Sequence, residues 1–256
     1  TQRTGIRVYG EDTDPGTMAA ALETGAIHAA LTPQLLRQCD LTVLALYPDD
    51  AVQWMQSRRS QIKKGSVVVD FCGVKQPVCQ AAEPIAREEG FFFIGGHPMA
   101  GKECWGFSYA VGDLYEGASM ILTPPPEWKE QADALRPLFF SLGFGQVVDT
   151  TPENHDRMIA YTSQLAHVAS SAFIKSPSSR QHVGYSAGSY KDLTRVAKLN
   201  PNMWTKLFLA NGDYLCEEID LLIEHLAQYR DAIAAGDKEK LYRLLKDGSD
   251  IKQSIG

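Results

Sequence analysis

The sequence lacks long hydrophobic runs, an excess of positive charge and cysteines with a recognisable spacing. No apolar stretch approaches the roughly 20 residues that a transmembrane helix needs, and the amino terminus has no signal-peptide core. The 25 Lys and Arg residues are outnumbered by 31 Asp and Glu residues, which gives a net charge of -6. Nucleic acids and anionic membranes both require a basic footprint, so we expect a soluble protein that binds neither of them.

Five cysteines are present, an odd number with no close pair of metal-ligand spacing. Neither a disulfide framework nor a metal site is therefore predicted, and a reducing cytoplasm is the expected compartment. The chain has 256 residues, of which 44% are hydrophobic. It can bury a large core and is close to the length at which chains divide, so two domains are expected.

Strand and helix signals alternate through residues 1–150. The strand signals are short apolar runs, and one of the helix signals between them ends in cations and glycine at Lys63-Lys64-Gly65. Strands are predicted at residues 6–9, 41–46, 66–71, 91–94, 118–122 and 146–148, and helices at 17–23, 50–62, 77–89 and 127–142. Repeated units of this kind predict a doubly wound α/β domain with a parallel sheet.

Strand signals nearly vanish after Thr151-Pro152, where threonine can cap a helix and proline fits its first turn. Residues 151–256 are therefore predicted to form an all-α second domain. Its longest helix is expected at residues 200–235 and would span about 50 Å. Apolar residues recur there at intervals of seven, as in packed long helices; they include Phe208, Leu215, Leu222 and Tyr229. The pattern fits packing within one chain, but the exposed apolar length favours a dimer interface.

One histidine has the setting of a catalytic group. His97 follows the apolar strand at 91–94 and Gly95-Gly96, and Pro98 restricts its backbone. The carboxyl end of such a strand is where open α/β sheets bind ligands. A base is thus predicted in a rigid turn at the reactive edge of the sheet. The alternative is a structural or solvated histidine, and nearby Glu103 either pairs with a cation or is solvated.

A second candidate is Asp12, an acidic residue that follows the strand at 6–9. A carboxylate at the end of the second strand of a nucleotide-binding unit accepts hydrogen bonds from the adenosine ribose and selects NAD over NADP. The simpler interpretation is that Asp12 only begins the next turn. No G-x-G-x-x-G motif precedes it, so the sequence as given is expected to lack the first strand, glycine loop and helix of the fold. NADP stays possible, although no arginine follows Asp12.

Two cations stand out in the second half. Lys191 and Arg195 are four residues apart, so they share a helix face and repel each other unless an anion compensates. Arginine is suited to bidentate binding of a carboxylate. A solvated face, with Asp192 pairing with Arg195, is the alternative. In the helix predicted at 154–175, His167 lies in a polar stripe, where a structural histidine is the default interpretation.

Taken together, these segments resemble the prephenate dehydrogenase family, which includes the arogenate and cyclohexadienyl dehydrogenases of tyrosine biosynthesis. The resemblance spans essentially the whole chain. Its most specific motif is His97-Pro98-Met99-Ala100-Gly101. The other matching segments are residues 8–12, 46–48, 70–75 and 191–204.

The resemblance implies a Rossmann-like dinucleotide-binding domain over residues 1–150 and a helical substrate-binding and dimerisation domain over residues 151–256. It implies NAD as the cofactor, bound by Asp12, Tyr47, Pro48 and Gly73. It also implies that His97 is the catalytic histidine, that Arg195 binds a substrate carboxylate, and that Lys191, His167 and Glu103 line the site. Family members are homodimers joined through the helical domain, in agreement with the long helix that carries the seven-residue repeat.

The implied activity is the NAD-dependent oxidative decarboxylation of prephenate to 4-hydroxyphenylpyruvate. Arogenate is the nearest alternative substrate, and a non-catalytic dimeric ligand-binding relative is the alternative of another class. Two residues depart from the family pattern, because many relatives have serine at Gly73 and some have a second histidine at Gln164. Both changes bear on the proton network around His97 and on substrate preference.

Overall fold

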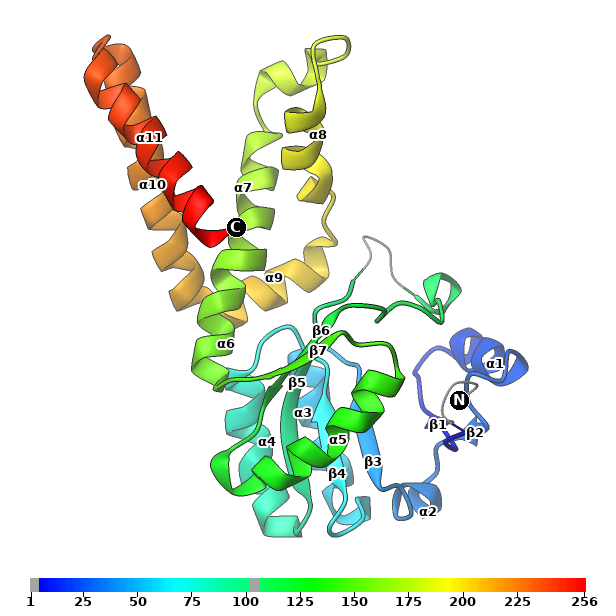
Figure 1. Cartoon of the computed structure of the whole chain (residues 1–256). Helices are drawn as coiled ribbons and strands as arrows, with labels where there is room; N and C mark the ends of the chain where they lie inside the picture. Colours follow the sequence, from blue (N-terminus) through cyan, green and yellow to red (C-terminus); the bar gives the residue numbers. More distant parts are fainter. Residues whose placement is uncertain (1–4, 102–105) are drawn as a thin grey trace.

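The computed structural model describes residues 5–101 and 106–256, and Figure 1 shows a sheet-containing part with a helical part above it. Five strands form one sheet in the order β3-β4-β5-β6-β7. Their bounds are β3 Leu41–Leu44, β4 Val67–Asp70, β5 Phe92–Pro98, β6 Ser119–Thr123 and β7 Gln146–Asp149. β3, β4 and β5 are parallel, and β6 and β7 are parallel to each other. β6 runs antiparallel to β5, so the prediction of a wholly parallel sheet is wrong at this pair.

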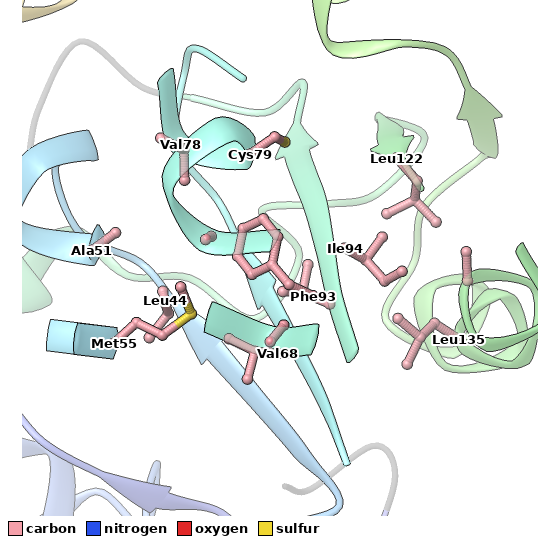
Figure 2. Close-up of a cluster of buried hydrophobic side chains, with 14 of the residues drawn as sticks. Leu44, Ala51, Met55, Val68, Val78, Cys79, Phe93, Ile94, Leu122 and Leu135 are labelled. Atoms are coloured by element: carbon pink, nitrogen blue, oxygen red, sulfur yellow. The ribbon is translucent and has the colours of Figure 1, made fainter. Parts of the chain in front are cut away.

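Three helices pack against this sheet and bury its faces. They are α3 Pro48–Arg58, α4 Gln76–Glu89 and α5 Lys129–Ser141. In β5, Phe93 and Ile94 point to opposite faces, as successive strand residues must. Figure 2 shows Phe93 on the side of Met55 from α3, and Ile94 on the side of Leu135 from α5. These four side chains are at most 8% exposed, so a hydrophobic layer covers each face of the sheet.

The first strands of the chain form a small separate sheet. The bounds are β1 Tyr9–Gly10, α1 Pro15–Glu23, β2 Ala29–Ala30 and α2 Pro33–Leu36. β1 pairs in parallel with β2, and the strand predicted at 6–9 begins at Tyr9 in the structure. β3 is the edge strand of the five-stranded sheet. The small sheet of β1 and β2 lies to the side of β3 in Figure 1.

The second half of the chain is helical, as predicted. Thr151 accepts the backbone N–H of Asn154, and Pro152 occupies the first turn of the first helix, so the predicted cap is present. The bounds are α6 Pro152–Ile159, the π-helix η4 Ala160–Leu165, α7 Ala166–Phe173, α8 Gly188–Thr194, α9 Pro201–Ala210, α10 Gly212–Ala234 and α11 Lys238–Ile255. Short 3-10 helices are η1 Arg59–Gln61, η2 Phe107–Tyr109, η3 Pro126–Trp128, η5 Pro177–Gln181 and η6 Arg195–Ala197.

The single long helix predicted at residues 200–235 is wrong, because it is interrupted at Asn211 between α9 and α10. Asn211 is followed by Gly212, and both residues have low helix propensity. The buried Asn211 side chain donates to the backbone oxygen of Asp156 at 2.9 Å and to Gln164 Oε1 at 2.8 Å. These contacts fix the break against α6 and η4. Among the described helices, none has both the length and the apolar character needed to cross a membrane.

Candidate active site

His97 lies inside β5, paired with β6, and not in a turn after the strand as predicted. β5 continues through the two preceding glycines because both are closely packed. A Cβ at Gly95 would lie 2.2 Å from Thr123 Oγ1, and one at Gly96 would lie 2.7 Å from the backbone oxygen of Asp70. The two glycines therefore allow neighbouring strands to approach and are not hinges. His97 is held at a fixed point of the sheet as a result.

The His97 side chain is hydrogen-bonded to His155, which in turn binds Asp156, and neither residue is among those predicted from the sequence. His97 Nδ1 is 2.8 Å from His155 Nε2, and His155 Nδ1 is 2.7 Å from Asp156 Oδ1. His155 is 2% exposed and Asp156 is fully buried, and both belong to α6. The three side chains form one hydrogen-bonded chain that runs from the sheet into the helical part.

The Asp156 carboxylate also binds the start of α4. Its Oδ1 accepts the backbone N–H of Lys75 at 2.7 Å, and its Oδ2 accepts that of Gln76 at 2.8 Å. With His155, three donors surround the carboxylate. The N–H groups at a helix start also favour a negative charge beside them. The acidic end of the hydrogen-bonded chain is therefore anchored on the sheet-containing part.

The hydrogen bonds determine which nitrogen of His97 is free. A carboxylate oxygen only accepts hydrogen bonds, so His155 donates from Nδ1 to Asp156. A neutral imidazole has one N–H, and His155 Nε2 therefore accepts the N–H of His97 Nδ1. The lone pair of His97 is then on Nε2. A neutral imidazole with one anchored nitrogen and one free lone pair is suited to general-base catalysis.

The protonation states agree with this assignment. Burial is the main reason that the pKa of His97 is lowered to about 3, and repulsion from His155 and from the Lys75 ammonium adds to it. Burial also lowers the pKa of His155, where Asp156 acts in the opposite direction. Both imidazoles are therefore neutral near pH 7, as the hydrogen-bond chain requires.

The lowered pKa predicts that acid destabilises the protein between about pH 6.5 and pH 3. In this window His97 of the unfolded chain, with its ordinary pKa of 6.5, binds more protons than His97 of the folded chain. The free energy of unfolding therefore decreases as the pH decreases. The slope from this group reaches about 1.4 kcal/mol per pH unit. Urea unfolding at pH 7 and pH 5, compared with His97→Asn, would measure it. The same pH dependence in both proteins would contradict the prediction.

A buried ion pair supports the strand that carries His97. Lys75 Nζ binds the Asp70 carboxylate, and both side chains are fully buried. Lys75 Nζ also donates to the backbone oxygen of Gly96 at 2.6 Å, and Asp70 Oδ1 accepts the Gly96 N–H at 3.2 Å. The residue before His97 is therefore held at both of its backbone polar groups by one ion pair.

The predicted cofactor residues Tyr47 and Gly73 contact α9. Lys206 Nζ is 4.9 Å from the centroid of the Tyr47 ring, and a Cβ at Gly73 would be 3.4 Å from Leu207. Tyr47 is the N-cap of α3, and Pro48 occupies the first turn of that helix. Tyr47 and Gly73 follow the parallel strands β3 and β4, at the edge where α/β sheets bind nucleotides. The structure thus places Tyr47 and Gly73 at the same edge of the sheet, and their contact with a cofactor stays a prediction.

Asp12, the remaining predicted cofactor residue, is exposed, and its Oδ1 accepts the backbone N–H of Asp14 at 2.8 Å. The interpretation that Asp12 begins a turn is thus confirmed, and an exposed carboxylate is still suited to a ribose diol. The glycine loop that binds a pyrophosphate has no counterpart before Asp12 in this sequence.

The predicted substrate residues His167 and Arg195 lie close together. His167 Nδ1 is 3.0 Å from the backbone oxygen of Val196, and the His167 ring packs on Trp204 with ring centroids 3.9 Å apart. Lys191 is on α8, and Arg195 begins η6 directly after it. The structure therefore places these three residues on one group of neighbouring elements, α7, α8 and η6.

Gln164, one of the two residues that depart from the family pattern, has a packing role in the structure. Gln164 is 1% exposed, its Nε2 donates to the backbone oxygen of Leu207 at 3.2 Å, and its Oε1 accepts from Asn211. The side chain therefore secures the break between α9 and α10. Glu103, the last predicted substrate residue, lies outside the described residues.

An α/β part with a parallel-rich sheet, a helical part and a buried histidine pair where they meet are the arrangement expected of a nucleotide-binding oxidoreductase with a helical second domain. The family model described as prephenate dehydrogenase, nucleotide-binding domain, matches residues 1–143. The model of the prephenate dehydrogenase dimerization domain matches residues 151–247. The chain therefore belongs to the prephenate dehydrogenase family, and the predicted order of an α/β domain and a helical domain is confirmed.

Two named relatives are distantly related to the chain. The chain is 25% identical to a prephenate dehydrogenase of Bacillus subtilis, over 98% of this chain and 70% of the relative. It is 28% identical to a cyclohexadienyl dehydrogenase of Zymomonas mobilis, over 86% of this chain and 76% of the relative. The crystal structure of Synechocystis arogenate dehydrogenase has a TM-score of 0.83 at 24% identity and covers 100% of this chain and 93% of that one. Prephenate dehydrogenase from A. aeolicus, in complex with hydroxyphenyl propionate and NAD+, has the same TM-score and identity over 100% and 91%. Both structures share the fold.

Proposed function

We propose that the protein is an NAD-dependent dehydrogenase that oxidatively decarboxylates prephenate to 4-hydroxyphenylpyruvate. The observation that carries the proposal is the anchored imidazole of His97, whose Nδ1 is 2.8 Å from His155 Nε2 and whose Nε2 is a free base. Family membership supports the reaction type. Arogenate, with an amine in place of the side-chain keto group, is the second candidate, because proteins of this fold are named for either substrate.

His97 Nε2 accepts the proton of the ring hydroxyl as the carbon–oxygen bond becomes a carbonyl. NAD, when bound, supplies the hydride acceptor. Loss of carbon dioxide then leaves an electron pair in the ring, which becomes aromatic, and His97 returns its proton to the same oxygen. The charges of substrate and products balance without release of a proton. His97 therefore holds the proton for the lifetime of the oxidised ring.

The other residues of the proposal bind and orient. Arg195 binds a substrate carboxylate through its two-pronged guanidinium group, beside Lys191 and His167, and Glu103 is proposed as a further substrate contact. On the cofactor side, the proposed contacts are Asp12 with the adenosine ribose and Tyr47, Pro48 and Gly73 near the nicotinamide end. NAD is preferred over NADP in this proposal because the Asp12 carboxylate repels a 2′-phosphate.

We further propose that the functional unit is a homodimer. The chain carries the dimerization domain of the family. α10 and α11 run side by side in Figure 1 and expose large apolar side chains, including Leu226 at 58%, Ile233 at 64% and Leu245 at 58%. Apolar area of this kind is stable in water when a second copy covers it.

Steady-state kinetics of the full-length protein with prephenate and arogenate, each with NAD and NADP, tests the function. We expect turnover of prephenate with NAD and a lower kcat/KM with NADP, because the Asp12 carboxylate repels the added phosphate. A preference for arogenate would favour the second candidate. Binding of either substrate without turnover would contradict the proposal and favour a non-catalytic ligand-binding protein.

A further inference from the structure

We propose that His155 and Asp156 form a proton relay with His97, in which His155 takes up the charge that His97 would otherwise carry. The inference rests on the dehydrogenase function proposed above and assigns two positioning residues to that reaction. The relay joins both parts of the molecule, because His97 is on β5 and the other two residues are on α6.

The distances allow a proton to pass without movement of the side chains. His97 Nδ1 and His155 Nε2 are 2.8 Å apart, and His155 Nδ1 is 2.7 Å from Asp156 Oδ1, both within hydrogen-bond length. When a proton reaches His97 Nε2, the proton on His97 Nδ1 moves to His155 Nε2. His97 is then neutral again, with its proton on Nε2, and His155 is a cation. The reverse transfer occurs when the phenol oxygen takes its proton back.

The charged surroundings favour the cation on His155. His155 is in direct contact with the Asp156 carboxylate, and Asp70 also attracts a charge at this position. Lys75 repels a charge on either imidazole, and among the described residues the charges that act on His97 include no carboxylate to offset that repulsion. In the described part of the chain, the charged residues that face the pair are Lys75, Asp70 and Asp156. Their arrangement gives the proton a more favourable site one step away from the substrate.

The relay is also sealed and rigid. His155 is 2% exposed and Asp156 is fully buried, so a proton held there does not exchange with water at each turnover. Asp156 is fixed by the backbone N–H groups of Lys75 at 2.7 Å and Gln76 at 2.8 Å. A buried proton that does not exchange with water is consistent with the proposed chemistry, because the proton taken from the hydroxyl returns to the same oxygen.

His155→Gln separates a relay from a purely orienting role. The glutamine carbonyl oxygen can accept the N–H of His97 Nδ1 and keep the His97 tautomer, but an amide does not take up a proton. With prephenate and NAD we expect kcat to fall by about 100-fold, the lower end of the range for loss of a proton-transfer group, at unchanged KM. The dependence of kcat on the deuterium fraction of the solvent should change from curved, for two moving protons, to linear. His225→Gln, on the exposed face of α10, is the matched control.

If kcat of His155→Gln is unchanged and still depends on the deuterium fraction along a curve, the relay is overturned. Turnover of prephenate by the wild-type protein would in that case still uphold the proposed function. No turnover by the wild-type protein would overturn both. If His155→Gln does not fold, ¹⁵N NMR of the wild-type protein with labelled histidine provides the second test. The relay requires a proton on Nδ1 of both His97 and His155, and a resting proton on His97 Nε2 would overturn it.

Discussion

Replacing His97 by asparagine is expected to lower kcat by about 10²- to 10⁴-fold, with little change in KM for prephenate. The asparagine amide can still donate an N–H toward His155, in place of the hydrogen bond that is 2.8 Å long in the structure. It provides no lone pair where His97 Nε2 stood, so the hydroxyl proton has no acceptor as the carbonyl forms. The loss therefore falls on the chemical step and not on binding.

Steady-state kinetics with prephenate and NAD would measure this loss, and a titration with NAD would show whether the cofactor site is still formed. His225→Asn is the matched control, because His225 is exposed on α10 and takes no part in the hydrogen-bonded chain. A kcat close to the wild-type value in His97→Asn would remove His97 as the base.

His97 could be found from the sequence because its signal is local. An apolar strand, two glycines and a proline follow one another within a few residues, and together they indicate a fixed position at a sheet edge. The predicted turn is a strand in the structure for a physical reason. The atoms that a Cβ would meet, Thr123 Oγ1 at 2.2 Å from one at Gly95 and the backbone oxygen of Asp70 at 2.7 Å from one at Gly96, belong to the neighbouring strands β6 and β4. A local pattern does not contain that information.

His155 and Asp156 could not be found in the same way, because the contact that gives them a role spans 58 residues. In the sequence they are two polar residues in the first turn of a helix, a common and uninformative pattern. The packing of α6 against the start of α4 places Asp156 at two backbone N–H groups and directs His155 toward His97. Without that packing, no local pattern distinguishes them from other polar residues near a helix start.

The two errors in the fold predicted from the sequence, the direction of β6 and the unbroken helix at residues 200–235, have a similar origin. The apolar pattern of β6 predicts a strand but not its direction, which depends on the path of the connection from β5. A parallel pair usually needs a crossover helix, and the described part of that connection contains only the short η2. The seven-residue repeat likewise continues across Asn211, although buried hydrogen bonds to Asp156 and Gln164 divide the helix there. Tertiary contacts override the local pattern in both places.

Lys75→Met is expected to destabilise the protein by about 3–5 kcal/mol, because it leaves the fully buried Asp70 carboxylate without its cation. Asp70 keeps the backbone N–H groups of Cys72 at 2.9 Å and Gly96 at 3.2 Å, but neither carries a full positive charge. The backbone oxygen of Gly96 also loses the ammonium donor that lies 2.6 Å away. Because Gly96 precedes His97, kcat should fall together with the stability.

Urea unfolding at one fixed protein concentration would measure this cost, since the stability of a dimer depends on concentration. Lys246→Met is the matched control: its partner is Asp250, the two side chains are 55% and 56% exposed, and we expect a cost of about 0.5 kcal/mol or less. Adding Asp70→Asn to Lys75→Met removes the second buried charge, so the double variant should be more stable than Lys75→Met alone. Equal costs for Lys75→Met and Lys246→Met, or a double variant weaker than the single one, would contradict a charged pair that stabilises the strand of His97.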